Sequence, residues 1–211
     1  ELQDYVNRLH RPIIVTEYAH SLGLDFDMMQ NVWELMYNNK NVAGGGVWDF
    51  TDLGILKRSK TPVDKNAFTP DVWLDKYNYY DARSTKGTDG ITYANRVPQP
   101  DYYEVKNVCA PVRVNIESYK IKPGKQIVTI PIENRYDFTN INECKFVWKQ
   151  VAFPSAMDEK GTTVVLKQGE VKGTDIAPHA AGVLKTNMPS LTDKVDAVFL
   201  TAIDKNGKEL W

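Results

Sequence analysis

One short apolar run in this chain ends abruptly in a carboxylate. It reads Pro-Ile-Ile-Val-Thr-Glu-Tyr-Ala-His and occupies Pro12–His20. Consecutive apolar and β-branched residues predict a strand that is covered on both faces, as in a parallel sheet. The carboxyl ends of parallel strands are where α/β folds place their reactive groups. Glu17, near this end, is therefore a candidate nucleophile or general base, and a solvated strand-end carboxylate is the alternative.

A second apolar strand is expected after three consecutive glycines, Gly44–Gly46. Glycines at the entry of a strand allow close backbone approach or unusual dihedral angles. The strand leads into Trp48, whose flat apolar face suits the C–H face of a sugar ring. Burial of Trp48 in a core is an equally weighted alternative, because tryptophan carries so much apolar area. Asp49 follows directly, and we expect it to support a site or to form an ion pair.

A helix is expected between the two strands, over residues 25–37. Its apolar residues recur at helical spacing, and Asp25 is a suitable N-cap. A further helix is expected upstream, at residues 2–9, from the same kind of periodicity. Residues 12–50 therefore form a strand–helix–strand unit, whose strands run parallel because crossover connections of this length join parallel strands.

The following connection, residues 51–90, lacks clear periodicity and is rich in aromatic residues. A connection this long is usually functional or disordered, and its aromatic side chains argue against disorder. Trp73 and Tyr77 are candidates for sugar contact, with packing as the favoured alternative. Pro100 then suits the first turn of a short helix, which ends before Pro111.

The second half of the chain contains short β segments separated by turn residues. The expected strands are 112–116, 127–132, 146–151, 162–166 and 197–201. Trp148 is interpreted as a core residue, and residues 205–208 as a hairpin turn. About 100 residues of this pattern predict an immunoglobulin-like β-sandwich. The chain is thus predicted to be α/β plus all-β, with domains at residues 1–110 and 111–211.

Composition excludes several classes of partner. The 211 residues carry a net charge of −1, which provides no field for nucleic acid or an anionic membrane. No stretch approaches the ~18–20 apolar residues of a transmembrane helix, and the charged start does not resemble a signal peptide. Cys109 and Cys144 are expected to be buried thiols, with a disulfide as the alternative in an exported parent protein. The compartment is left open.

Three blocks, in the right order, resemble glycoside hydrolase family 2, the β-galactosidase family. They are residues 16–23, residues 44–50 and the block Asp89–Pro100. The resemblance implies that the first 110 residues are the last part of a (β/α)₈ TIM barrel, containing its final two strands and an exit helix. It also implies that a β-sandwich domain follows.

The resemblance carries roles onto individual residues. Glu17 aligns with the nucleophile that forms a covalent glycosyl-enzyme intermediate in a retaining reaction. His20 aligns with a histidine that contacts galactose hydroxyls, and Trp48 with the tryptophan that stacks on the sugar. Asp89 stands where some members place an asparagine at a sodium site, so it is interpreted as site support together with Asp49 and as a weak metal candidate. No cofactor is assigned, although the resemblance leaves Mg or Na ions open for a parent enzyme.

A retaining glycosidase also needs an acid/base carboxyl, about 5–5.5 Å from the nucleophile. In the family this group belongs to an Asn-Glu pair on an earlier strand, and the only such pair here is Asn142-Glu143, far into the β-rich half. A closed barrel also needs ~250 residues. We therefore expect a C-terminal piece of a longer enzyme, inactive by itself.

The expected partners follow from this interpretation. They are a terminal β-linked galactoside or a related sugar and the remaining domains of the parent chain, with a homo-oligomeric parent left open. The alternative function is a non-catalytic carbohydrate-binding or interdomain structural module.

Overall fold

The computed structural model describes residues 2–20, 29–64, 72–82, 87–114, 116, 126–189 and 191–211. The chain divides into two compact units, Glu1–Cys109 (unit 1) and Ala110–Trp211 (unit 2), and each is described by itself.

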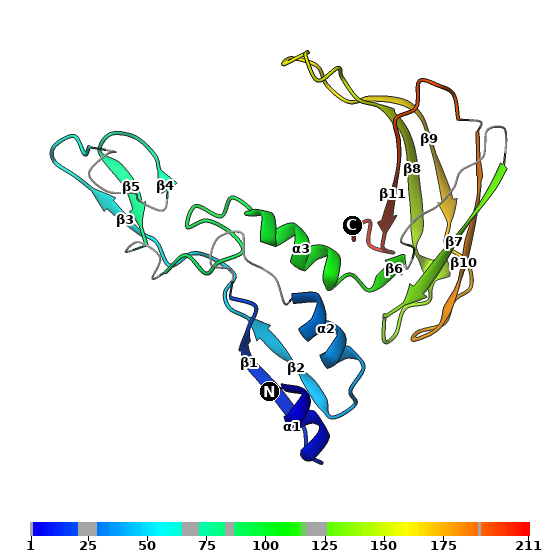
Figure 1. The fold of residues 1–211 in the computed structure, drawn as a ribbon, viewed down its shortest axis with the longest axis horizontal. Helices are drawn as coiled ribbons and strands as arrows, with labels where there is room; N and C mark the ends of the chain where they lie inside the picture. Colours follow the sequence, from blue (N-terminus) through cyan, green and yellow to red (C-terminus); the bar gives the residue numbers. More distant parts are fainter. Residues whose placement is uncertain are drawn as a thin grey trace. The chain divides into compact units, whose positions relative to one another are not determined.

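Unit 1 is built on two parallel strands, β1 (Ile13–Tyr18) and β2 (Val42–Val47), with Tyr18 opposite Val47. The helix α1 (Leu2–Arg8) precedes β1, and α2 (Met29–Tyr37) lies between the strands in sequence (Figure 1). The predicted parallel strand–helix–strand unit is confirmed. The predicted helix start at Asp25 lies outside the described residues.

The expectation that β1 is covered on both faces is wrong for the described part of the chain. Tyr18 is buried in a cluster with Met29 and Met36 of α2, whereas Ile14 is 69 % exposed. Successive side chains of a strand point to opposite faces. Because α2 packs on one face of this two-stranded sheet, the side chains on the other face remain open to solvent.

Gly45 permits the close approach of β2 to β1. A Cβ atom at this position would lie 2.7 Å from the backbone oxygen of Val15, closer than side chains tolerate. The predicted role of the glycines in close backbone approach is confirmed here. The strand does not follow the glycines as expected, because β2 begins at Val42 and the three glycines lie inside it, paired with β1.

Residues 51–90 contain a second sheet that the sequence analysis missed. The strands β3 (Ile55–Arg58), β4 (Val72–Trp73) and β5 (Asn78–Asp81) form an antiparallel sheet in the order β3-β5-β4. The rings of Trp73 and Tyr79 lie 5.6 Å apart, which agrees with the packing alternative for Trp73. These strands are two to four residues long, and β3 has no alternation of buried and exposed residues, so periodicity could not reveal them.

The helix α3 (Pro100–Val108) forms as predicted, with a proline in its first turn. Val108 is buried in the same cluster as Tyr18, and Tyr102 and Val105 pack against it. This packing joins α3 to the β1–α2–β2 unit in one core.

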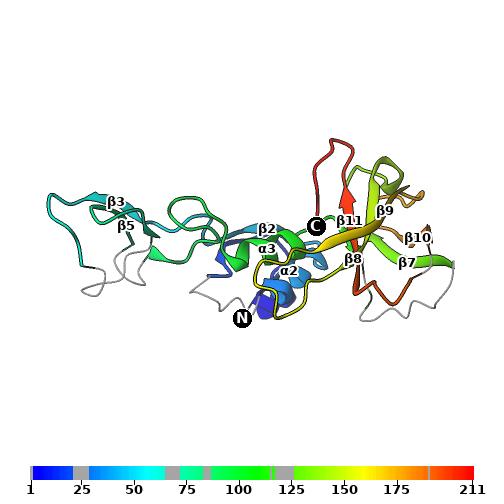
Figure 2. The ribbon, with the colours of Figure 1, turned by 90° about the horizontal axis from the view of Figure 1, so that it is seen from above.

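Unit 2 consists of two antiparallel three-stranded sheets that share one core (Figures 1 and 2). One sheet has the order β10-β7-β6 and the other the order β11-β8-β9. Their strands are β6 (Val112–Val114), β7 (Gln126–Asn134), β8 (Lys145–Ala152), β9 (Val164–Lys172), β10 (Ala181–Met188) and β11 (Ala197–Ile203). Phe146 and Trp148 of one sheet and Ile132 and Leu184 of the other belong to this core, so the core assignment of Trp148 is confirmed.

β10 was not predicted, although its side chains alternate. Leu184, Thr186 and Met188 are buried, and the residues between them are exposed. Because the polar residue Thr186 lies on the buried face, the hydrophobicity of the sequence does not alternate clearly along β10. The predicted hairpin turn is confirmed, because Gly207 adopts a φ of +83° and Asp204 bonds to Lys208 across the turn.

Neither of the two cysteines forms a disulfide. Cys144 is buried and Cys109 is half-buried.

In the described part of the chain, no helix combines the length and the apolar character needed to cross a lipid bilayer.

Candidate functional site

Glu17 lies one residue before the end of β1, and its side chain is 51 % exposed. The chain turns sharply just after the strand, because Ala19 adopts a left-handed φ of +55° that is uncommon for a residue with a Cβ. This turn brings His20 back toward the strand end. His20 Nε2 lies 3.6 Å from Glu17 Oε2.

Trp48 directly follows β2 and lies beside the same strand end. Its backbone N–H donates to the carbonyl of Tyr18 at 3.0 Å, which continues the pairing of the two strands. Its ring lies 6.3 Å from that of His20, with a 36° angle between their planes. The residue is 37 % exposed, so the core alternative for Trp48 does not hold within unit 1 as described.

Asp89 reaches the site from far along the chain. Its Oδ2 lies 3.4 Å from His20 Nδ1, and its side chain is only 19 % exposed. The structure therefore brings together Glu17, His20, Trp48 and Asp89, all of which the sequence analysis had selected.

Asp49 lies next to Asp89, because its backbone N–H donates to the carbonyl of Asp89 at 2.9 Å. Burial, followed by the negative charge of Asp89, raises the pKa of Asp49 above its ordinary value, against the lowering influence of backbone hydrogen bonds and His20. The Oδ1 atoms of both carboxyl groups are buried without a hydrogen-bond partner. The raised pKa of Asp49 therefore reflects its burial beside a second carboxyl group.

Asp49 Oδ1 and Asp89 Oδ1, which lack hydrogen-bond partners, are possible ligands of a cation. Magnesium prefers a shell of six oxygen ligands, several of them usually water. The described residues contain no group of three or more histidine, cysteine, aspartate or glutamate side chains that could hold a metal ion. Asp89 and Asp49 are thus the two carboxyl groups that the described structure places together here.

A buried hydrogen-bond network holds the backbone of Gly90, the residue that follows Asp89. The Asp52 carboxylate accepts from the backbone N–H of Gly90 at 2.9 Å and from Gln99 Nε2 at 3.0 Å. The same Gln99 amide donates to the carbonyl of Gly90 at 2.9 Å. Sequence reasoning assigned no role to Gln99, and the only signal for it was its place between two prolines at the end of the block Asp89–Pro100.

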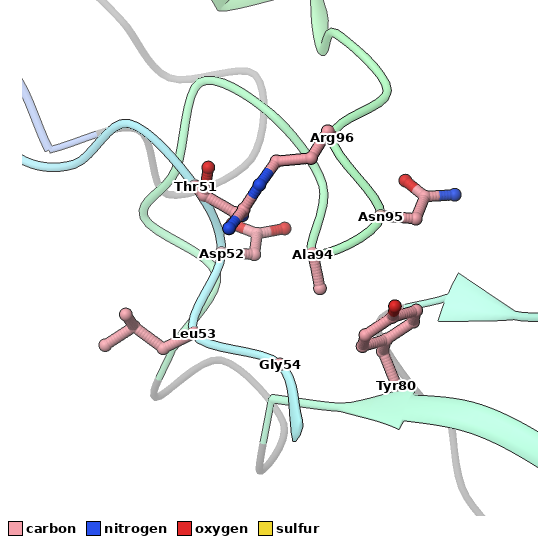
Figure 3. A pocket seen from close by; sticks show the side chains of 8 residues that line it. All are labelled: Thr51, Asp52, Leu53, Gly54, Tyr80, Ala94, Asn95 and Arg96. Carbon is pink, nitrogen blue, oxygen red and sulfur yellow. The ribbon is translucent and has the colours of Figure 1, made fainter. Parts of the chain in front are cut away.

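A separate concavity lies beside this network. Its volume is about 450 Å³, and it is lined by Thr51, Asp52, Leu53, Gly54, Tyr80, Ala94, Asn95 and Arg96. Figure 3 shows the Arg96 side chain directed toward Thr51 and Asp52. Neither Glu17 nor His20 lines this pocket, so it is distinct from the cluster at the end of β1.

Glu143, in the only Asn-Glu pair, has a structural role. Its carboxylate accepts from the backbone N–H of Asn140 and contacts Lys205, which together hold its pKa below the ordinary value. These contacts belong to a capping box on the short 3₁₀ helix Ile141–Glu143 in unit 2.

Comparison with known proteins identifies the family. The sequence model described as "Glycosyl hydrolases family 2, TIM barrel domain" matches residues 1–114, more than half of the chain. The chain belongs to glycosyl hydrolase family 2. The matched range includes β1, β2 and all the residues gathered at their ends, so unit 1 is part of a family 2 TIM-barrel domain.

Several curated proteins resemble the chain, and the three described here are each named "Beta-galactosidase". The protein from Leuconostoc mesenteroides is 22 % identical over 155 residues, covering 74 % of this chain and 14 % of the relative. The protein from Pseudoalteromonas haloplanktis is 23 % identical over 176 residues (82 % and 15 %), and the one from Oenococcus oeni is 26 % identical over 160 residues (76 % and 15 %).

The chain therefore spans about one seventh of the length of these relatives. The alignments cover more of the chain than unit 1 alone, so the similarity to these proteins continues into unit 2.

Proposed function

We propose that this chain carries the nucleophile of a retaining exo-β-glycosidase that acts on terminal β-galactosides. The observation that carries the proposal is the gathering of Glu17, His20, Trp48 and Asp89 at the ends of two parallel strands in a family 2 barrel segment. The names of the relatives support galactose as the sugar.

Glu17 suits the part of the nucleophile because its carboxylate is half exposed at the strand end. In the proposed reaction, it attacks the anomeric carbon and the glycosidic bond to the leaving oxygen breaks, so that a glycosyl ester forms. Water then cleaves this ester and the anomeric configuration is retained. Trp48 provides an exposed apolar face for the sugar, and His20 provides a ring nitrogen for a sugar hydroxyl.

The acid/base is proposed to come from an earlier strand of a longer enzyme. Glu143 does not fit this part, because its carboxylate is bound within a capping box of unit 2. Without a proton donor for the leaving group, the 211-residue chain by itself is expected to hydrolyse no aryl β-galactoside. Measurable turnover that disappears in Glu17→Gln would overturn this expectation.

Covalent labelling tests the nucleophile directly. A longer enzyme containing this chain is incubated with a 2-deoxy-2-fluoro-galactoside carrying an activated leaving group, digested, and analysed by peptide mass spectrometry. We expect the label on Glu17 and none in Glu17→Gln. A label on any other residue refutes the assignment, and no label in an enzyme that still hydrolyses galactosides refutes the covalent mechanism.

Unit 2 is proposed to be an immunoglobulin-like sandwich. In that fold the central strands of the two sheets pair with strands that come much later in the chain. The pairs β7–β10 and β8–β11 follow this pattern, and the two sheets enclose a common core that includes Trp148. A non-catalytic module for carbohydrate binding or interdomain contact remains the alternative function, and it gains support if Glu17 is not labelled.

A further inference from the structure

The ring of His20 lies between two carboxylates that face its two different nitrogens. Nδ1 lies 3.4 Å from Asp89 Oδ2, and Nε2 lies 3.6 Å from Glu17 Oε2. Only the contact with Asp89 is within hydrogen-bond distance. In a neutral imidazole one nitrogen donates and the other accepts, and the hydrogen bond made by one nitrogen decides the state of the other.

Asp89 is held more firmly than Glu17. Its side chain is 19 % exposed, against 51 % for Glu17. Its carbonyl accepts from the N–H of Asp49, and the next residue, Gly90, donates its N–H to the buried carboxylate of Asp52. Because this backbone is held by hydrogen bonds, we expect the orientation of the His20 ring to depend on the position of the Asp89 carboxylate.

The other sides of the ring are also constrained. Ala19, with its left-handed backbone, sets the direction in which His20 leaves the strand. The ring of Trp48 lies 6.3 Å from the ring of His20. The ring of His20 thus has neighbours at both nitrogens and on the side of Trp48.

We propose that Asp89 is a positioning residue for the site: it accepts the hydrogen of His20 Nδ1 and so leaves Nε2 as the nitrogen that faces Glu17. In the neutral ring Nε2 then has a lone pair, so it accepts a hydrogen from a sugar hydroxyl instead of donating one. This inference rests on the proposed function, in which Glu17 reacts with the sugar and His20 contacts it.

The hydrogen on each ring nitrogen can be observed in the 211-residue chain by ¹⁵N NMR. The chain has three histidines, His10, His20 and His179, so the ring spectra are few enough to assign. At a pH above the ordinary titration range of histidine, we expect His20 in the Nδ1–H form. His179 provides an internal contrast, because its Nε2 lies 3.0 Å from Asp137 Oδ1, and we expect it in the Nε2–H form.

Substitution separates positioning from general effects on the fold. Asp89→Leu removes the acceptor and keeps the number and branching of the side-chain heavy atoms, and His20 is expected to lose the Nδ1–H signature while His179 keeps its own. Asp137→Asn is the matched control, and it is expected to shift only the signals of His179. An Nε2–H form of His20 in the unsubstituted chain, or an Nδ1–H signature that persists in Asp89→Leu, overturns the proposal.

Asp89→Asn covers the case in which the leucine variant does not fold. An amide oxygen is a weaker acceptor than a carboxylate, so the Nδ1–H population is expected to fall below that of the unsubstituted chain. An unchanged population overturns the proposal. These spectra need no catalysis, so a failure to label Glu17 refutes the proposed function alone, whereas a failure of the spectra refutes the positioning role alone.

Discussion

His20 Nδ1 and Asp89 Oδ2 lie 3.4 Å apart, although the two residues are 69 positions apart in the chain. The contact joins the end of β1 to the segment that leads into α3. It depends on the backbone around Asp89, which Asp52 and Gln99 hold in place through buried hydrogen bonds. The stability of this support can therefore be tested separately from any activity.

Asp52→Ala is expected to destabilise unit 1. The substitution leaves the Gly90 N–H and the Gln99 amide without their buried acceptor. An unsatisfied buried polar group costs about 1–3 kcal/mol. Urea unfolding, followed through NMR signals of unit 1, measures the loss. Glu104→Ala, an exposed acid on α3, is the control and should change the free energy of unfolding by less than ~0.5 kcal/mol.

Gly90→Ala is expected to disturb the same support by steric overlap. A Cβ atom at this position would meet the backbone of Asp52 and Thr51 at distances that real contacts never show. Because the obstacle is backbone, the cost is expected to reach the ~1–3 kcal/mol of an overpacked core, or more. Gly46→Ala is the control, since its Cβ would lie 3.2 Å from one backbone oxygen and needs only a small shift. Equal losses for both variants in the same unfolding experiment would contradict this account.

Asp49→Asn is expected to stabilise unit 1 at neutral pH. The pKa of Asp49 is raised by burial and by Asp89, so the native state binds more protons than the unfolded state between the ordinary and the raised pKa. Stability therefore falls as the pH rises through this window, and the amide removes that loss. Below the ordinary aspartate pKa the charge-related gain disappears. Unfolding curves at several pH values check the sign, and a gain that is independent of pH would exclude the carboxyl charge as its cause.

Two neighbouring residues of β10 test the core of unit 2. Leu184 is fully buried between the sheets, whereas Val183 is 41 % exposed. Leu184→Ala is expected to cost about 2–5 kcal/mol through lost burial and a cavity. Val183→Ala is expected to cost less than ~1 kcal/mol, since an exposed strand position loses only β-propensity and local contacts. Similar losses in thermal or urea unfolding would argue against the alternating arrangement of β10.

Several elements followed directly from local sequence patterns. The helix α3 was predicted from the proline at its start and from the spacing of its apolar residues. The strand β1, with a carboxylate at its end, was predicted from the apolar run before Glu17. By contrast, β10 was missed because Thr186 lies on its buried face, and β3–β5 were missed because such short strands show no period. The predicted covering of β1 on both faces was wrong, because hydrophobicity does not reveal which faces find a partner.

The sequence by itself determined the type of each reactive side chain and its place at a strand end. Such features depend on neighbours along the chain, through periodicity, capping and the glycines that allow β2 to approach β1. Only the tertiary structure decided that Asp89, and no other acid in the described chain, lies against His20 Nδ1. That contact joins residues 69 positions apart and depends on the buried support from Asp52, and no local pattern contains either relationship.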